Sequence, residues 1–257
     1  MMQPFSTLRL TSSWTQLWRA LVLTLGGLMS SSALADTVEQ LYQQAGWAQQ
    51  RTHFTQALQH TQQGFKGSLP EVVYQALLEN SNQRFAPDKL RQQALNTLRS
   101  QLTQADPALA FFSSPLGRKV VAAETTATSP STLRQYQQGI PKQPLEVSRQ
   151  LVLRQLGERI PFAEAGAEVA LALSSVAASS LTQMIPGVFS SAQTNDLLGS
   201  QRQHLVQQMN QDLDNTLALV YRDLSDEELE QYLAFAQSAS GQAYFSAALK
   251  AVQAALH

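Results

Sequence analysis

The sequence predicts an all-α protein, a helical bundle in which no sheet is expected. Apolar residues recur at spacings of three and four over most of the chain, which is the period of an amphipathic helix. No stretch shows sustained apolar–polar alternation, and no Asn-Gly or Asp-Gly pair joins two apolar runs as a hairpin turn. Ser and Pro stand where several of the helices are expected to begin, which adds a third, independent indication.

The first 35 residues have the composition of a secretory signal peptide. Arg9 and Arg19 precede an apolar run from Ala20 to Met29, and residues 33–35 read Ala-Leu-Ala, an A-x-A cleavage motif. The run is half the ~20 residues that a membrane-spanning helix needs, so no stable span is expected after cleavage. We expect cleavage after Ala35 and a periplasmic or secreted protein, with an uncleaved N-terminal anchor as the alternative.

The composition of the mature chain excludes several classes of protein. Its 222 residues are enough for a sizeable core, and 16 basic against 19 acidic residues give a net charge of about −3. Tight binding to nucleic acid depends on clustered Lys and Arg, so no nucleic-acid partner is expected. The chain has no cysteine, which removes disulfides, thiol catalysis and thiolate metal sites.

The N-terminal unit, residues 36–123, is predicted to be a series of helices. Residues 36–65 form one helix interrupted near Gly46, or two helices. Pro70 and Pro87 stand in the first turn of the next two, where proline is tolerated. The last of these has one apolar face, formed by Leu95, Leu98 and Leu102.

Residues 124–144 lack an apolar stripe and are rich in Thr, Ser, Pro and Gly, which predicts a linker or long loop. The C-terminal unit, residues 145–257, resumes the amphipathic pattern. A single helix is expected from about Asn195 to Leu224, because apolar residues continue at helical spacing through it. The stripe consists of Val206, Met209, Leu213, Leu217, Val220 and Leu224.

The next helix has unusually complete start signals. Ser225 and Glu228 have the spacing of a capping box, and Leu224 can pack on Leu229 as a hydrophobic staple. Asp226 and the acids after it also suit the positive end of the helix dipole. We therefore interpret this acidic cluster as a helix start and not as a metal or acid–base site.

Residues 169–195 form a run without charge that is rich in Ala and Ser. Small residues at this density favour a buried central helix, since they let helices approach closely. Membrane or lipid contact and a ligand-lined groove remain as alternatives.

Two similar sequence motifs, at residues 109–120 and 233–244, indicate an internal duplication into two related helical units. An offset of 124 aligns Leu109, Ala110, Phe111, Ser114, Gly117 and Ala123 with Leu233, Ala234, Phe235, Ser238, Gly241 and Ala247. We interpret each motif as a helix–helix joint and not as an active-site loop. Ser114 and Ser238 are expected to cap a helix, with Pro115 in its first turn. Gly117 and Gly241 leave room for a neighbouring helix, and Phe111 and Phe235 anchor the preceding one.

The same residues carry a resemblance to a known family. Phe111 to Val120 ("FFSSPLGRKV") and Val220 to Tyr244 ("VYRDLSDEELEQYLAFAQSASGQAY") resemble the exported bacterial family catalogued as domain of unknown function 2059, in two divergent copies. The second unit is expected to be the better match, because it keeps the acid-rich helix start. It departs from the family pattern at Ala239, where the pattern has Pro. The resemblance implies an exported helical protein and brings no catalytic residues.

No recognisable catalytic, cofactor-binding or metal-binding constellation occurs in the sequence. It has no G-x-S-x-G, H-E-x-x-H or phosphate-binding loop. The mature histidines are interpreted as surface or core residues: His53, His60, His204 and His257. Glu164 and Glu168 are one turn apart and suggest a paired-carboxylate site, although solvated helix faces carry such pairs more often.

Three functions remain open at this point. The favoured one is a non-enzymatic interaction or scaffold module whose partner is an unknown envelope protein. The second is a carrier or sensor of an apolar ligand or lipid, with Leu171, Leu173 and Ile185 lining a cavity. The third is an enzyme with an unrecognised site.

Overall fold

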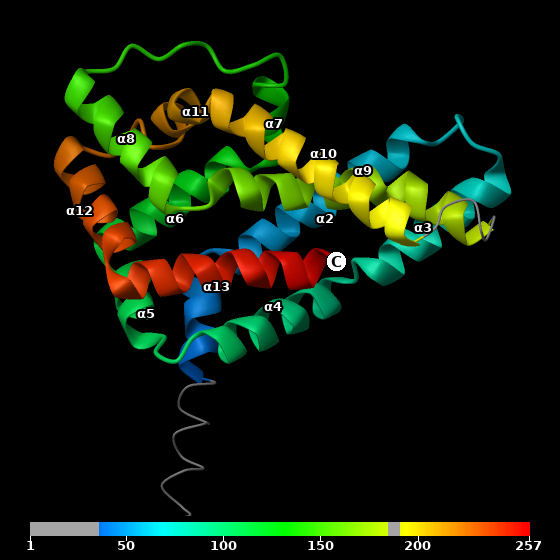
Figure 1. Ribbon diagram of the computed structural model, residues 1–257, viewed down its shortest axis with the longest axis horizontal. Coiled ribbons are helices and arrows are strands. Elements are labelled where there is room, and N and C mark those ends of the chain that lie inside the picture. The colour runs from blue at the N-terminus through cyan, green and yellow to red at the C-terminus, as the bar shows by residue number, and fades with distance from the viewer. Residues whose placement is uncertain (1–35, 185–190) are drawn as a thin grey trace, which may run out of the picture.

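Figure 1 shows a computed structural model of the chain, which describes residues 36–184 and 191–257. The secondary structure in these ranges is helical and contains no strand, so the predicted all-α bundle is confirmed. The signal peptide and its cleavage site lie outside the described residues. Within the described part, no helix is both long and apolar enough to cross a membrane.

The N-terminal half folds as a run of helices joined by short connections. Residues 36–44 are helical, and Gly46 then breaks the chain with a positive φ of 79°, so residues 36–65 form two helices. The following elements are α2 (Trp47–Gly64), α3 (Glu71–Arg84), α4 (Pro87–Gln101), α5 (Asp106–Ser113), α6 (Pro115–Ala127) and α7 (Pro130–Gln135).

The C-terminal half contains the longest helices. They are α8 (Val147–Arg159), α9 (Phe162–Met184), α10 (Ser191–Gln211), α11 (Leu213–Val220), α12 (Asp226–Gln237) and α13 (Ala239–Leu256). The prediction of one helix from Asn195 to Leu224 was wrong, because the chain breaks at Asp212. The two parts of its apolar stripe pack on different helices: Met209 lies against Gly166 of α9, and Leu213 lies against Gly157 of α8.

The expected linker at residues 124–144 is also partly helical. Residues 124–127 complete α6, and Ser129 caps α7 by accepting a hydrogen bond from the Thr132 amide at 3.3 Å. Thr and Ser lowered the apparent helicity of this stretch, yet here they serve as helix ends. Residues 128–129 and 136–146 lack regular helix, and the longer of these two stretches arches from α7 to α8 at the top of Figure 1.

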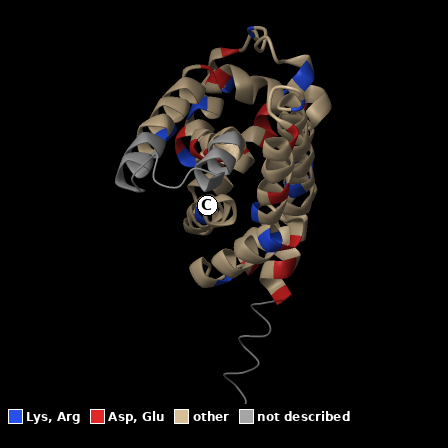
Figure 2. Cartoon of the chain, turned by 90° about the vertical axis from the view of Figure 1, so that its right-hand side faces the viewer, with Lys and Arg blue, Asp and Glu red and all other residues tan. Residues whose placement is uncertain are grey.

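The two halves share one hydrophobic core. It joins buried residues of the first half, such as Leu41, Leu98 and Phe112, to buried residues of the second, such as Leu229 and Ala251. Helices α4 and α13, from the two halves of the chain, lie side by side (Figure 1). A second, smaller cluster groups Phe54, Leu58, Leu77, Phe85, Leu90, Ala172, Val176 and Leu256. In the view of Figure 2, acidic and basic positions are interspersed along the same helices.

Candidate functional site

The two similar motifs, at residues 109–120 and 233–244, each form a helix–helix joint, and the two joints have the same local geometry. The Gly117 amide donates to Ser114 Oγ at 2.9 Å, and the Gly241 amide donates to Ser238 Oγ at 3.0 Å. Both serines are extended and begin a helix, with Pro115 in the first turn of α6. A Cβ added to Gly117 or Gly241 lies only 2.0 Å from a carbonyl oxygen of the preceding helix. The structural roles expected of these residues are therefore observed.

The joints meet each other through their phenylalanines. The rings of Phe111 and Phe235 stack with centroids 3.9 Å apart and planes at 3°. Phe112 packs edge-on against Phe235 and lies 4.8 Å from the ring of Tyr244. Each phenylalanine was expected to anchor the helix that precedes its joint, and the stack in addition joins α5 directly to α12.

The acidic cluster after Leu224 is a helix start, as expected. Glu228 accepts a hydrogen bond from the Ser225 amide at 2.8 Å, and Ser225 Oγ accepts one from the Glu228 amide at 3.2 Å. Lys119 of α6 also contacts Glu228 at 2.6 Å. The helix start is thereby attached to the first half of the protein.

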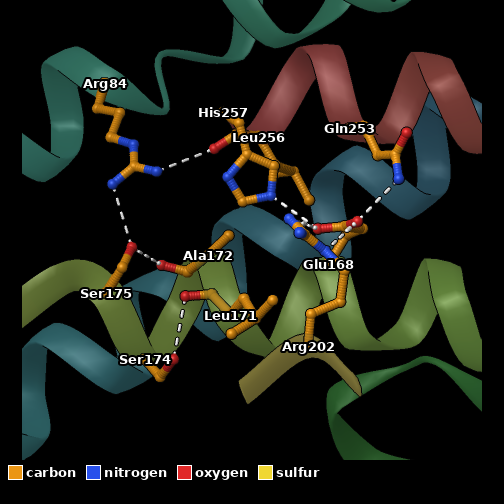
Figure 3. A network of polar contacts seen from close by, with 10 residues as sticks. All are labelled: Arg84, Glu168, Leu171, Ala172, Ser174, Ser175, Arg202, Gln253, Leu256 and His257. Atoms are coloured by element: carbon orange, nitrogen blue, oxygen red, sulfur yellow. Dashed lines mark hydrogen bonds and ion pairs between the residues drawn. The ribbon is translucent and has the colours of Figure 1, made fainter. Parts of the chain in front are cut away.

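Glu168 of α9 is the least exposed carboxylate of the described residues, and Figure 3 shows it surrounded by donors from two other helices. Arg202 of α10 contacts both carboxylate oxygens, at 2.8 and 3.1 Å. Gln253 Nε2 donates to Oε1 at 2.9 Å, and His257 Nε2 lies 2.8 Å from Oε2. Glu164, its expected partner, is exposed, so the structure does not form the paired-carboxylate site.

The electrostatics of Glu168 suit a structural role. Burial alone raises its pKa, but hydrogen bonds from Arg202, Gln253 and His257 outweigh burial and hold the pKa below its ordinary value. Both oxygens are occupied, and a carboxylate of low pKa is a weak general base. This network therefore stabilises the contact of α9 with α10 and α13 rather than leaving an oxygen free for a substrate.

Arg84 attaches α3 to the same region. Its guanidinium donates to Ser175 Oγ and to the Leu256 carbonyl, both at 3.1 Å (Figure 3), and lies 4.7 Å from the ring centre of Phe85. Burial lowers the pKa of Arg84 below its ordinary value. The last turn of α13 is thus held from two sides, by Arg84 and by Glu168.

Glu124 of α6 forms a second polar contact between the halves. Its Oε1 accepts hydrogen bonds from Tyr221 at 2.6 Å and from Tyr232 at 3.0 Å, and both tyrosines are fully buried. Burial raises the pKa of Glu124 above its ordinary value, although the two hydroxyl donors act against this shift. Burial and the nearby carboxylate raise the pKa of both tyrosines well above the usual value.

A shallow groove of about 300 Å³ lies beside this contact. Its walls come from α6, α7 and the region of α11, and its lining mixes alanines with polar residues. The polar lining residues are Lys119, Thr126, Thr132, Gln135, Tyr136, Arg222 and Asp223. Lys119 and Arg222 each have an acidic neighbour, Glu228 and Asp223, so the groove carries no free charge of one sign.

The histidines do not assemble with acids into a metal site: no group of three or more potential ligands occurs among the described residues. His60 and His204 are exposed. His53 joins α2 to Thr128, with Nδ1 3.1 Å from the threonine oxygen, and burial lowers its pKa. Only His257 touches a buried acid.

The uncharged segment is a buried helix in the part that the structure describes. Leu171, Ala172 and Val176 are buried in α9, and Leu173 packs on the second core cluster. Ile185, the third residue of the expected cavity, lies outside the described residues. The expected cavity therefore stays a prediction.

Sequence reasoning missed Glu124 as a core contact and undervalued Glu168. Glu124 was assigned to a linker because Thr and Ser surround it, although its position seven residues after Gly117 continues the buried face of α6. One signal for Glu168 was available in the sequence: it immediately precedes the uncharged run at residues 169–195, whose apolar residues place that helix face in the core.

Comparison with known families supports the resemblance found in the sequence. Residues 88–142 match a family described as an uncharacterized protein conserved in bacteria (DUF2059). The match covers α4 to α7 and the start of the following loop, whereas we expected the better match in the C-terminal unit. No curated protein and no solved structure matches the chain. The resemblance to this bacterial family is therefore confirmed, in the segment that contains the first joint.

Proposed function

We propose that the protein is a non-enzymatic interaction or scaffold module that is exported to the bacterial cell envelope. The observation that carries the proposal is that two carboxylates with shifted pKa values, Glu124 and Glu168, are both bonded to other helices of the fold. Glu168 has both oxygens bonded to side chains of other helices, and Glu124 shares one oxygen between two buried tyrosines. Residues that join helices in this way build a fixed framework, which suits a protein that presents surfaces to a partner.

Export forms the second part of the proposal, and it rests on the first 35 residues. The charged start, the short apolar run and the Ala-Leu-Ala motif together have the order of a cleaved signal peptide. The envelope location also fits a chain without cysteine whose stability comes from a shared core.

Two divergent copies of one helical unit form the third part. The support is the matching geometry of the joints at Ser114 and Ser238 and the near-parallel stack of Phe111 on Phe235. A fused pair of units gives a larger rigid framework than either unit alone.

The test is a crosslinking experiment in intact cells, followed by purification of the tagged protein from the periplasmic fraction. We expect the mature chain to begin at Asp36 and to yield a reproducible adduct with an envelope protein. The same preparation examined by native mass spectrometry distinguishes the carrier alternative, which predicts a bound lipid. A protein that stays in the cytoplasm, or that turns over a substrate without any adduct, contradicts the proposal.

A further inference from the structure

The connection between α7 and α8 contains two exposed prolines three residues apart, Pro141 and Pro144. Residues 139–146 read Gly-Ile-Pro-Lys-Gln-Pro-Leu-Glu and have no regular secondary structure. Pro141, Lys142 and Pro144 are exposed, whereas Ile140 and Gln143 between them are half-buried. The prolines are therefore exposed to solvent, while the half-buried side chains beside them pack against the rest of the protein.

The residues of this segment restrict it to an extended conformation. The rings of Pro141 and Pro144 fix φ near −65°, and each proline pushes the residue before it, Ile140 or Gln143, toward the extended region. Glu146, at the end of the segment, has φ −63° and ψ 145°, the angles of a polyproline II helix. A polyproline II helix has three residues per turn, so the spacing of Pro141 and Pro144 is the one that places two prolines on one edge of such a helix.

Four contacts hold the segment in place. The side chain of Asn215 in α11 accepts from the Gln143 amide at 2.9 Å and donates to the Ile140 carbonyl at 3.1 Å. Leu145 packs against the main core, and Gly139, with φ 105°, donates to the Tyr136 carbonyl at 2.9 Å. A segment that is fixed before binding loses little conformational entropy when a partner binds it.

We propose that residues 140–145 are a preformed recognition segment for a partner domain with a shallow, aromatic-lined groove. Such grooves bind polyproline II segments by packing aromatic rings against spaced prolines. Lys142 lies between the prolines and is exposed, so the matching groove is expected to carry an acidic side chain at its edge. The inference rests on the proposed function and identifies the surface and the class of partner.

The experiment places a photo-crosslinking amino acid, p-benzoylphenylalanine, at position 142 of the full chain in living cells. The matched control places it at Val72 of α3, an exposed position 76% accessible and outside the segment. We expect an adduct from position 142 but not from position 72. The variant Pro141→Ala/Pro144→Ala is expected to reduce the adduct at least about tenfold.

A synthetic peptide of residues 139–146 should compete for the adduct, and the same peptide with both prolines replaced by alanine should not. Asn215→Ala, which frees the segment from α11, is expected to weaken the adduct less than the double proline variant does. Thermal melting checks that every variant is folded. Because both proline side chains are exposed, the melting temperature of the double proline variant should stay close to that of the wild type.

The results separate this inference from the proposed function. An adduct that persists after both prolines are replaced in a folded protein overturns the recognition segment. Adducts with an envelope protein at other surfaces, but none at position 142, also overturn it while leaving the scaffold function intact. If neither position 142 nor a general crosslinker captures any envelope protein, both proposals fail together.

Discussion

Gly241 packs so closely on the preceding helix that even a methyl group does not fit. A Cβ there lies 2.0 Å from the Phe235 carbonyl oxygen, and this backbone atom cannot rotate away. Gly241→Ala is expected to lower the free energy of unfolding by about 3 kcal/mol, and Gly241→Leu by more. Urea titration measures this loss. Gly64→Ala is the control, since no atom lies within 4 Å of its Cβ position. If the two substitutions lower the free energy of unfolding equally, close packing at Gly241 is not the cause.

Glu168 and Glu164 are a matched pair on one helix, one buried and one exposed. Glu168→Ala is expected to lower the free energy of unfolding by about 2 kcal/mol near pH 7, because Arg202, Gln253 and His257 lose the acceptor of their hydrogen bonds. Glu164→Ala should change stability by less than about 0.5 kcal/mol. Chemical denaturation of both variants measures the free energy of unfolding. A similar decrease of this free energy in the two variants contradicts the proposed role of Glu168.

The pH dependence of this loss has a defined sign. The folded-state pKa of Glu168 lies below its ordinary value of 4.5, so its stabilisation is present above that pH and is lost as the pH falls through the folded pKa. The stability difference between wild type and Glu168→Ala should therefore shrink on acidification.

Glu124 is expected to behave in the opposite way. Its folded-state pKa is raised, so the stability linked to it is complete below the ordinary value of 4.5 and is lost as the pH rises through the folded pKa. Glu124→Gln keeps an acceptor for the tyrosines without the charge, and should raise the melting temperature at pH 7 but not at pH 4. Glu230→Gln, at an exposed position, is the control. A lower melting temperature of Glu124→Gln at pH 7 contradicts the expected shift.

At the scale of the helix, the start of α12 depends on the reciprocal bonds between Ser225 and Glu228. Ser225→Ala removes the side-chain acceptor and is expected to lower the free energy of unfolding by about 1 kcal/mol. Ser246→Ala, on an exposed face inside α13, removes a hydroxyl that caps nothing and serves as the comparison. The melting temperatures of both variants are measured. If the melting temperature of Ser225→Ala equals that of the wild type, the cap adds no stability.

The helices with local start signals were those that the sequence predicted best. Ser114, Ser225 and Ser238 each bond to the amide three residues later, so the information lies within four residues of sequence. The break at Asp212 was not predictable in this way. Its cause is that Met209 and Leu213 contact different helices, which depends on how distant segments pack.

In the candidate site, too, the local features were predictable and the contacts between distant segments were not. The roles of Gly117 and Gly241 were predictable because the joint is local. The bonds of Glu124 and Glu168 connect residues 34 to 108 positions apart, so neither contact has a signature in the surrounding sequence.

At the scale of the molecule, contacts between the halves occur in every part of the core. Phe111 stacks on Phe235, Glu124 binds the tyrosines of α11 and α12, and α4 lies along α13. Neither half can bury its apolar surface alone, so the expected division into an N-terminal and a C-terminal unit does not correspond to two independent cores. Folding should therefore be cooperative over the whole mature chain.

Trp47 provides the measurement, because it is the only tryptophan after residue 35 and it contacts the last helix. Its Nε1 donates to Tyr244 Oη at 3.1 Å, and its ring stacks on Tyr42. Trp47 fluorescence and far-UV circular dichroism should give one coincident urea transition, because losing α13 exposes Trp47 and unfolds the shared core together. The Tyr244→Phe variant, which removes the hydroxyl, should shift both curves equally. A fluorescence transition at lower urea than the circular dichroism transition contradicts a single cooperative unit, since it shows that α13 leaves the first half while most helices persist.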